Sequence, residues 1–148
     1  MNFYLDANAK RPERAHYTDA GLDLFISKFL DNNTLNNQVY ILKPGHTCVL
    51  DTGVHVDIKD PCAGFVLPRS SISMLGIMTH TGVIDSGYTG SIKVVITNLN
   101  KYKKVKLYLG QKIAQLVIQP VMLPYLNQVS ELPDTERGSD GFGSTGKF

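Results

Sequence analysis

The chain is poor in cysteine, nearly neutral and without a long apolar run, and each of these features excludes a class of function. Its two cysteines, Cys48 and Cys62, lack C-x-x-C spacing and have no histidine cluster beside them, so neither a zinc site nor a disulfide framework is indicated. Fifteen Lys and Arg against thirteen Asp and Glu leave a formal net charge of +2, too weak for a general nucleic-acid or membrane surface. Any anion must therefore be bound by a local group of side chains.

Targeting signals are also lacking. The opening stretch "MNFYLDANAKRPER" has no basic region followed by an apolar one, the layout that marks a secretory signal, and no apolar run approaches the length of a membrane span. We therefore expect a soluble protein of the cytoplasm, or of the host cytoplasm for a viral source, with no membrane and no direct nucleic-acid partner. The cysteines are then expected to be small core residues, and the lysine-rich residues 101–106 an exposed hairpin edge.

The pattern along the chain favours β structure. A length of 148 residues fits one domain, and short segments rich in β-branched residues alternate with Gly, Pro, Asn and Asp, which is typical of a sandwich or barrel. Only "SSISMLG" looks helical, with Ser70 or Ser71 as the N-cap and Gly76 at its end. The expected strands lie within residues 22–26, 39–42, 47–58, 64–68, 77–84, 91–99, 105–109 and 113–121.

Two of these strands carry polar residues within apolar patterns. In "TGVHVDI", Val54, Val56 and Ile58 share one face, which places His55 on the opposite face, toward solvent. The strand "IAQLVI" is apolar on both faces except for Gln115. This pattern indicates burial on both sides, contact with another subunit and a polar partner for Gln115.

The stretch "PRSS" has the composition of an anion site. Arg69 stands beside Ser70 and Ser71 at a helix start. Free backbone N–H groups and the helix dipole favour negative charge there, and the arginine adds a fork of donors.

The C-terminal stretch "RGSDGFGSTG" has a similar composition. From about residue 133 the chain becomes polar and Gly-rich, which indicates a mobile arm. Arg137 supplies charge, Ser144 and Thr145 supply hydroxyl groups, and the glycines let backbone amides approach oxygen atoms closely. A flat ring stacked on Phe142 would give this isolated aromatic a partner.

The hairpin stretch "GVIDSGYTG" carries the remaining chemistry. Asp85 follows an apolar pair at a strand end, where its carboxylate could orient or deprotonate a water. The alternative is an ordinary turn residue. Tyr88 could lie beneath a sugar, or it could be a half-buried strand aromatic.

Five stretches, "AGLDL", "PRSS", "GVIDSGYTG", "GQKIAQL" and "RGSDGFGSTG", resemble in order and spacing the five motifs of the homotrimeric dUTP pyrophosphatases (dUTPases). Together they span nearly the whole chain, from Ala20 to Gly146. The resemblance implies a jelly-roll-like distorted β-barrel over residues 1–132 with one short helix, and a flexible arm over residues 133–148. It also implies a homotrimer with active sites at the subunit interfaces, each closed by the arm of a neighbouring subunit.

The resemblance further implies hydrolysis of dUTP to dUMP and pyrophosphate, which limits uracil incorporation into DNA and supplies dUMP for dTTP synthesis. Asp85 would direct water at the α-phosphorus, Tyr88 would pack under the deoxyribose, and Asp23 would hold waters of a Mg²⁺ ion bound mainly by the phosphates. The remaining substrate contacts implied are Arg69, Ser70, Ser71 and Gln115 for phosphate, backbone at Val83, Ile84, Asp85 and Lys93 for uracil, and Arg137, Phe142, Gly143, Ser144 and Thr145 from the arm.

This sequence departs from the motifs at several positions. In the third motif, Gly87 stands where the family often has Asp, and Ser91 stands where it often has Glu or Asn. In the fourth motif, Gln111 and Lys112 stand in place of a frequent Asp-Arg pair. We expect these changes to alter structural or subunit contacts more than chemistry. Thr79 and Asp140 also depart, and a negative charge at Asp140 would slow closure of the arm if it faced the phosphates.

Two alternatives share the fold. A dCTP deaminase needs a carboxylate as proton carrier, and Val95 stands where such relatives have a Glu. A nucleotide-binding signalling or interaction module is the other alternative, because fold alone does not prove function.

Overall fold

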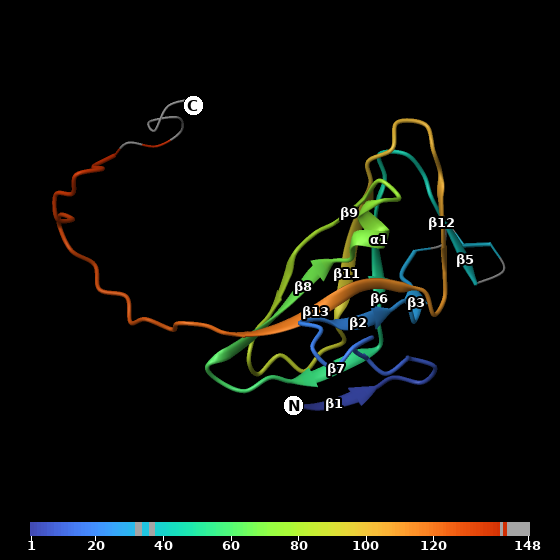
Figure 1. Cartoon of the computed structure of the whole chain (residues 1–148), viewed down its shortest axis with the longest axis horizontal. Coiled ribbons are helices and arrows are strands. Elements are labelled where there is room, and N and C mark those ends of the chain that lie inside the picture. The colour runs from blue at the N-terminus through green and yellow to red at the C-terminus, as the bar shows by residue number, and fades with distance from the viewer. Residues whose placement is uncertain (32–33, 36–37, 140, 142–148) are drawn as a thin grey trace.

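A computed structural model describes residues 1–31, 34–35, 38–139 and 141 of the chain (Figure 1). The regular secondary structure of these residues is β strand apart from one short helix, as predicted. The elements in chain order are β1 (Asn2–Leu5), β2 (Leu22–Phe25), β3 (Lys28–Phe29), β4 (Thr34–Leu35), β5 (Val39–Leu42), β6 (Thr47–Asp51), β7 (Val54–Asp57), β8 (Cys62–Pro68), α1 (Ser70–Ser73), β9 (Ile77–Thr79), β10 (Gly82–Ile84), β11 (Lys93–Asn98), β12 (Val105–Tyr108) and β13 (Lys112–Pro120).

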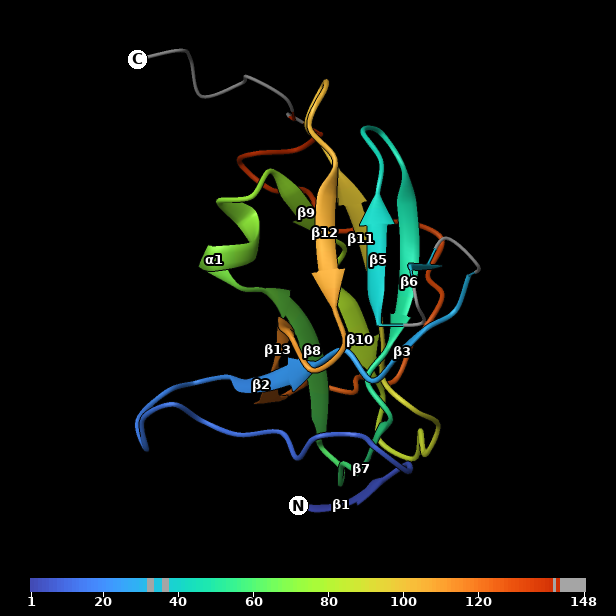
Figure 2. The ribbon, with the colours of Figure 1, turned by 90° about the vertical axis from the view of Figure 1, so that its right-hand side faces the viewer.

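The strands form four antiparallel sheets (Figure 2). Two sheets have four strands, in the orders β10-β8-β13-β2 and β3-β6-β11-β9, and β12-β5-β4 and β1-β7 form smaller sheets. Side chains from both four-stranded sheets meet in one apolar cluster, for example Leu24 and Leu116 from one and Leu50 and Ile96 from the other. The predicted strand segments all contain strands, whereas β1, β3 and β4 were not predicted.

Alternate side chains of β7 face the core, as predicted. Val54 and Val56 are buried, and so is Ile58 just beyond the strand. His55, however, does not face open solvent, since its side chain is only 24% exposed. The reason is β1, which pairs with β7 so that Tyr4 lies opposite His55.

The helix is shorter than predicted and begins differently. Arg69 is its N-cap residue, without a side-chain capping hydrogen bond, so the prediction that Ser70 or Ser71 caps the helix is wrong because both serines already lie inside it. The helix ends at Ser73 rather than at the predicted Gly76, and a turn carries the chain on to this glycine. Gly76 adopts φ +75°, and a Cβ there would lie 2.6 Å from Nδ2 of Asn100, so glycine suits both the conformation and the close approach.

The cysteines and the lysine-rich stretch have structural roles. Cys48 and Cys62 are free, and burial, followed by the charge of Asp31, raises the pKa of the Cys48 thiol to about 12.

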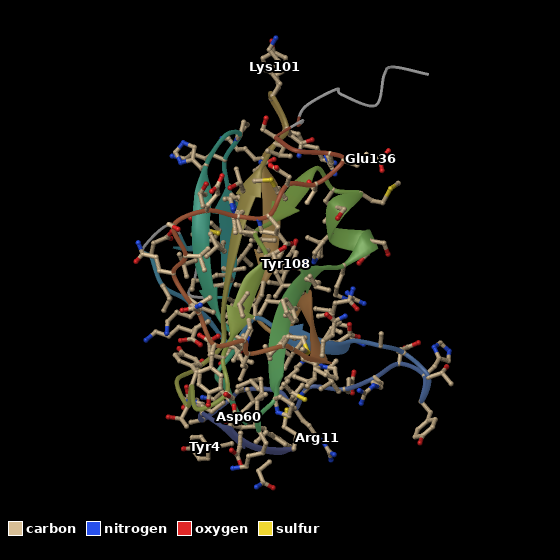
Figure 3. The ribbon with its side chains drawn as sticks, turned by 90° about the vertical axis from the view of Figure 1, so that its left-hand side faces the viewer. Tyr4, Arg11, Asp60, Lys101, Tyr108 and Glu136 are labelled. Carbon is tan, nitrogen blue, oxygen red and sulfur yellow. The ribbon has the colours of Figure 1, made fainter. Side chains whose placement is uncertain are left out.

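The lysine-rich stretch, residues 101–106, begins in the turn between β11 and β12, with Lys101 at one end of the molecule (Figure 3). It continues onto β12, an edge strand, as expected for exposed residues that guard a hairpin edge.

The chain leaves the body after β13 (Figure 1). Beyond Pro120 it runs without helix or strand through residue 139, and apolar side chains there lie in solvent. Met122, Leu123, Tyr125 and Leu126 are each at least 68% exposed. Such a run of exposed large apolar residues is unusual for an isolated soluble chain and indicates a surface that another molecule covers.

The central strand β13 should dominate the stability of the fold. Leu116 on β13 is fully buried and lies opposite Leu22 on one side and Val66 on the other. We expect Leu116→Ala to lower the free energy of unfolding by about 2–5 kcal/mol, because it leaves a cavity where the structure cannot collapse freely. Urea denaturation at one fixed protein concentration measures this, with the exposed Gln119→Ala on the same strand as the control. Equal urea midpoints for the two variants would show that Leu116 contributes no more to stability than an exposed residue of the same strand.

Candidate functional site

A polar cavity of about 290 Å³ opens beside β13. Three of the five sequence stretches meet there: "AGLDL", "PRSS" and "GQKIAQL". The lining residues are Ala15, Asp19, Ala20, Gly21, Asp23, Arg69, Ser70 and Gln115.

Strand register explains why these stretches meet. β13 is hydrogen-bonded on both sides, so Gln115 lies opposite Asp23 of β2 and opposite Leu67 of β8. Arg69 and Ser70 follow directly after β8 ends at Pro68. Antiparallel pairing across three strands therefore places one carboxylate, one amide and one guanidinium at the same position along the sheet.

Asp23 is the electrostatic centre of the cavity. Its Oδ1 lies 2.7 Å from Nε of Arg69, and its Oδ2 lies 2.7 Å from Nζ of Lys112. Lys112 also lies 3.2 Å from Oε1 of Glu13. Hydrogen bonding to Asp23, and then to Glu13, raises the pKa of Lys112. The nearly buried carboxylate of Asp23 thus has two cationic partners, as a buried charge requires.

Lys112 is a site residue that sequence reasoning missed. Its position was expected to be structural or interfacial, and in a regular strand residues 112 and 115 would point to opposite faces. The register of β13 against β2 shifts between Lys112 and Ala114. Such a bulge inserts one residue, which brings Lys112 to the same carboxylate that lies opposite Gln115. The bulge leaves no signal in the residue pattern that we could identify.

Gln115 has the polar partner that its strand pattern required. Its Nε2 donates to the carbonyl oxygen of Pro68 at 2.9 Å. A Cβ on Gly21 would lie 2.2 Å from Oε1 of Gln115, so the glycine of "AGLDL" leaves room for this amide. Ser71, in contrast, is exposed and lies just outside the lining, where its Oγ accepts from Nη1 of Arg69 at 3.4 Å.

The hairpin residues lie elsewhere in the same chain. β10 pairs with the other side of β8, and among the described residues that line the cavity none comes from 82–93. Asp85 is exposed just after β10. Val83 and Tyr88 are 55% and 43% exposed, Ile84 is buried, and Lys93 begins β11 opposite Asp51.

The departures in the third motif have local physical explanations. Gly87 adopts φ +83° with open space around it, a conformation that Asp tolerates better than most residues, so glycine suits the same turn. Ser91 is buried and donates to the carboxylate of Asp51. The hydroxyl of Thr79 is buried with no hydrogen-bond partner among the residues that the structure describes.

In the fourth motif, Gln111 has a structural role. Its Oε1 accepts a hydrogen bond from the backbone N–H of Tyr108 at 3.0 Å and so closes the turn between β12 and β13.

The arm is only partly described. Arg137 is exposed and lies in a turn of the segment that follows β13. Asp140, Phe142, Gly143, Ser144 and Thr145 lie outside the described residues.

Two carboxylates, those of Asp19 and Asp23, line the cavity. Within the described ranges, no group of three or more His, Cys, Asp or Glu side chains has the arrangement of a metal cage. Such a small number of carboxylates suits Mg²⁺, because this ion is usually held by one or two carboxylates together with phosphate oxygens and retained waters.

The antiparallel β fold and the cavity with Arg69, Ser70 and Gln115 define an all-β protein with a compact polar cavity whose donor groups suit an anion. A family model described as dUTPase matches residues 7–146, and the chain belongs to the dUTPase family. Curated relatives named deoxyuridine 5'-triphosphate nucleotidohydrolase include one from Corynebacterium glutamicum, 39% identical over 97% of this chain and 91% of that protein. Another, from Cutibacterium acnes, is 41% identical over 91% of this chain and 84% of that protein.

Solved structures are similar over most of the chain. The Staphylococcus bacteriophage 80alpha dUTPase with dUpNHpp has a TM-score of 0.83 at 31% identity and covers 99% of this chain and 98% of its own. A mutant dUTPase from phage phi11 of S. aureus, described with a structural Mg(II) ion, has a TM-score of 0.74 at 30% identity and covers 88% of this chain and 96% of its own. The predicted family and jelly-roll-like fold are confirmed.

The Lys112–Asp23 pair yields a pH-dependent prediction. We expect Lys112→Met to lower the urea midpoint at pH 7, because it leaves Asp23 with one cation. Pairing raises the pKa of Lys112, so its contribution is full below the pKa of the unfolded chain and is lost as the pH rises through the higher folded value. The control is Lys106→Met on β12, since Lys106 has no ion pair among the described residues. Equal midpoints for both variants at pH 7 would contradict the role of the pair.

Proposed function

We propose that this protein is a dUTP diphosphatase that hydrolyses dUTP to dUMP and pyrophosphate, and so supplies dUMP for dTTP synthesis and limits uracil incorporation into DNA. The observation that carries the proposal is the cavity in which Arg69, Ser70 and Gln115 meet Asp23, in a chain of the dUTPase family. Arginine and hydroxyl donors suit a triphosphate because charge-assisted hydrogen bonds to phosphate oxygens are short and strong. Ser71, which contacts Arg69, would extend the same phosphate site.

The active site would be completed by other copies of the chain in a homotrimer. The hairpin with Asp85 and Tyr88 does not line the cavity of its own chain, and both residues are exposed. The uncovered apolar residues after β13 also call for a partner surface. In this arrangement, backbone groups at Val83, Ile84, Asp85 and Lys93 would bind uracil.

The arm, residues 133–148, would close over a neighbouring subunit's site. Arg137, Gly143, Ser144 and Thr145 would bind the γ-phosphate, and Phe142 would stack on uracil. Closure of such a segment excludes water and completes the set of groups around the phosphates.

The chemical step would be an attack by water on the α-phosphorus. The carboxylate of Asp85 accepts a proton from the water, the new P–O bond forms, and the bond from the α-phosphorus to its bridging oxygen breaks, so that pyrophosphate leaves. Arg69 and Ser70 stabilise the charge that develops on the phosphate oxygens. Tyr88, packed beneath the deoxyribose, would leave no room for a 2′-hydroxyl.

Magnesium is the proposed cofactor. When bound, Mg²⁺ neutralises phosphate charge and orients the triphosphate. Asp23 would hold its waters, and the ion pairs with Lys112 and Arg69 fix this carboxylate in position.

The alternatives are less well supported. Val95 on β11 offers no acid or base for deamination of a cytosine ring. The phage 80alpha dUTPase is described as controlling transfer of virulence genes by a G-protein-like mechanism, but we find no feature of this chain that favours such a role. No helix among the described residues is long and apolar enough to span a membrane, and we propose a cytoplasmic location.

The function is tested by pyrophosphate release from dUTP, dCTP, dTTP and UTP, with and without Mg²⁺, together with analysis of the nucleotide products. We expect Mg²⁺-dependent release from dUTP alone, with dUMP as the product. Binding of dUTP without any turnover would favour a signalling module, and formation of dUTP from dCTP would favour deamination.

The role of Asp85 is tested by Asp85→Asn. We expect this variant to bind dUpNHpp as the wild type does but to lose about 10²- to 10⁴-fold in kcat, the usual contribution of a general base. Calorimetry and steady-state kinetics separate the two effects, and Asp57→Asn on β7 controls for removal of an exposed carboxylate. Wild-type turnover by Asp85→Asn would rule out the assigned role.

The arm is tested by deletion of residues 137–148. We expect the shortened chain to keep the fold and the oligomeric state of the full chain but to hydrolyse dUTP poorly, because the site would stay open to water. Sedimentation and pyrophosphate release provide the two measurements. Undiminished activity would show that the arm is no lid.

A further inference from the structure

Three side chains hold the loop between β10 and β11, which carries Asp85 and Tyr88. Ser86 Oγ donates to the carboxylate of Asp60, and Ser91 Oγ donates to the carboxylate of Asp51. Between these contacts, Nδ1 of His55 lies 2.7 Å from the carbonyl oxygen of Thr89.

The orientation of the Tyr88 ring depends on the backbone of this loop. Its hydroxyl donates to the carbonyl of Ser91 at 3.1 Å. The ring lies so close to Gly90 that a Cβ there would be 2.4 Å from the Tyr88 hydroxyl oxygen. A rotation of the peptide plane between Thr89 and Gly90 would therefore displace the ring.

The hydrogen bond of His55 to the Thr89 carbonyl restrains that peptide plane. A carbonyl oxygen only accepts hydrogen bonds, so Nδ1 is the donor in this contact. On the other side of the ring, Nε2 lies 3.2 Å from Oδ1 of Asp6. The Tyr4 ring packs edge-on with its centroid 5.4 Å away. The imidazole is thus restrained by the N-terminal segment while it donates to the loop, at the end of the molecule where Tyr4 and Asp60 are found, opposite Lys101 (Figure 3).

We propose that His55 is a positioning residue: its hydrogen bond to the Thr89 carbonyl sets the Tyr88 ring in place and thereby contributes to discrimination between deoxyribonucleotides and ribonucleotides. This inference rests on the proposed function, in which Tyr88 lies beneath the sugar.

The other two contacts of the loop do not involve His55. Burial acts to raise the pKa of Asp51, but hydrogen bonds from Ser91 and the Gly53 N–H outweigh it, with a smaller effect of nearby positive charge, so the pKa is lowered. Asp51 therefore remains an ionised acceptor for Ser91. Because neither this contact nor the one from Ser86 to Asp60 uses an atom of His55, we expect both to persist when His55 is replaced, and a variant of His55 should alter the position of the loop without releasing it.

Two amide substitutions separate the two ring nitrogens. His55→Asn can place an N–H near the position of Nδ1, whereas the longer side chain of His55→Gln places its amide near the position of Nε2. We expect His55→Asn to retain the ratio of kcat/KM for dUTP to that for UTP. We expect His55→Gln to lower this ratio about three- to tenfold, the effect of one net hydrogen bond.

Asp57→Asn is the matched control. Asp57 lies two residues from His55 on the same face of β7, and its partners are Asn2 and Lys59 rather than the loop. Asp6→Asn tests the Nε2 side, and both controls should keep the wild-type ratio. Thermal melting of each variant verifies that it is folded.

Hydrogen exchange gives a measurement that does not require activity. Amide exchange in residues 86–91 should be faster in His55→Gln than in the wild type and unchanged in His55→Asn and Asp57→Asn. Equal substrate ratios for the two His55 variants, or equal exchange in the loop, would overturn the inference. If the wild type releases no pyrophosphate from dUTP, the proposed function fails, and the role in specificity fails with it. The exchange contrast would still decide whether His55 holds the loop.

Discussion

The position of β13 between β2 and β8 is the constraint on which the site depends. Because the strand is hydrogen-bonded on both sides, any shift of its register would move Gln115 away from both Asp23 and the end of β8. The buried Leu116 beside Gln115 fixes that register, since a shift by one residue would turn it out of the core. The core and the cavity are therefore set by the same pairing.

The cavity also gives a nearly neutral chain a local group of donors that suits a polyanion. Arg69 and Lys112 are balanced by Asp23 and Glu13 in the free protein, so no uncompensated charge is left in a partly buried place. The pairing of β13 with β2 and β8 places the candidate phosphate donors Arg69, Ser70 and Gln115 beside one cavity. This local arrangement needs no basic surface, in agreement with a formal net charge of +2.

Three errors of sequence reasoning have separate structural causes. His55 was assigned to open solvent because the pattern of β7 cannot reveal that β1 pairs with it. Lys112 was missed because a bulge breaks the two-residue period on which strand patterns rest. The serines of "PRSS" were taken as caps because serine favours that position, whereas the helix begins directly after the arginine that follows β8.

The sequence by itself determined the all-β class, most strands, the position of the one short helix and the family, because alternation, turn residues and motifs are local properties of the chain. Only the tertiary structure decided that Asp23, Arg69 and Gln115 share one cavity and that Lys112 pairs with Asp23. It also decided that the hairpin of Asp85 and Tyr88 lies outside this cavity and that His55 contacts the hairpin loop. Those outcomes depend on pairings between strands far apart in the chain. Such pairings are selected by the packing of the whole core, which no short stretch of residues records.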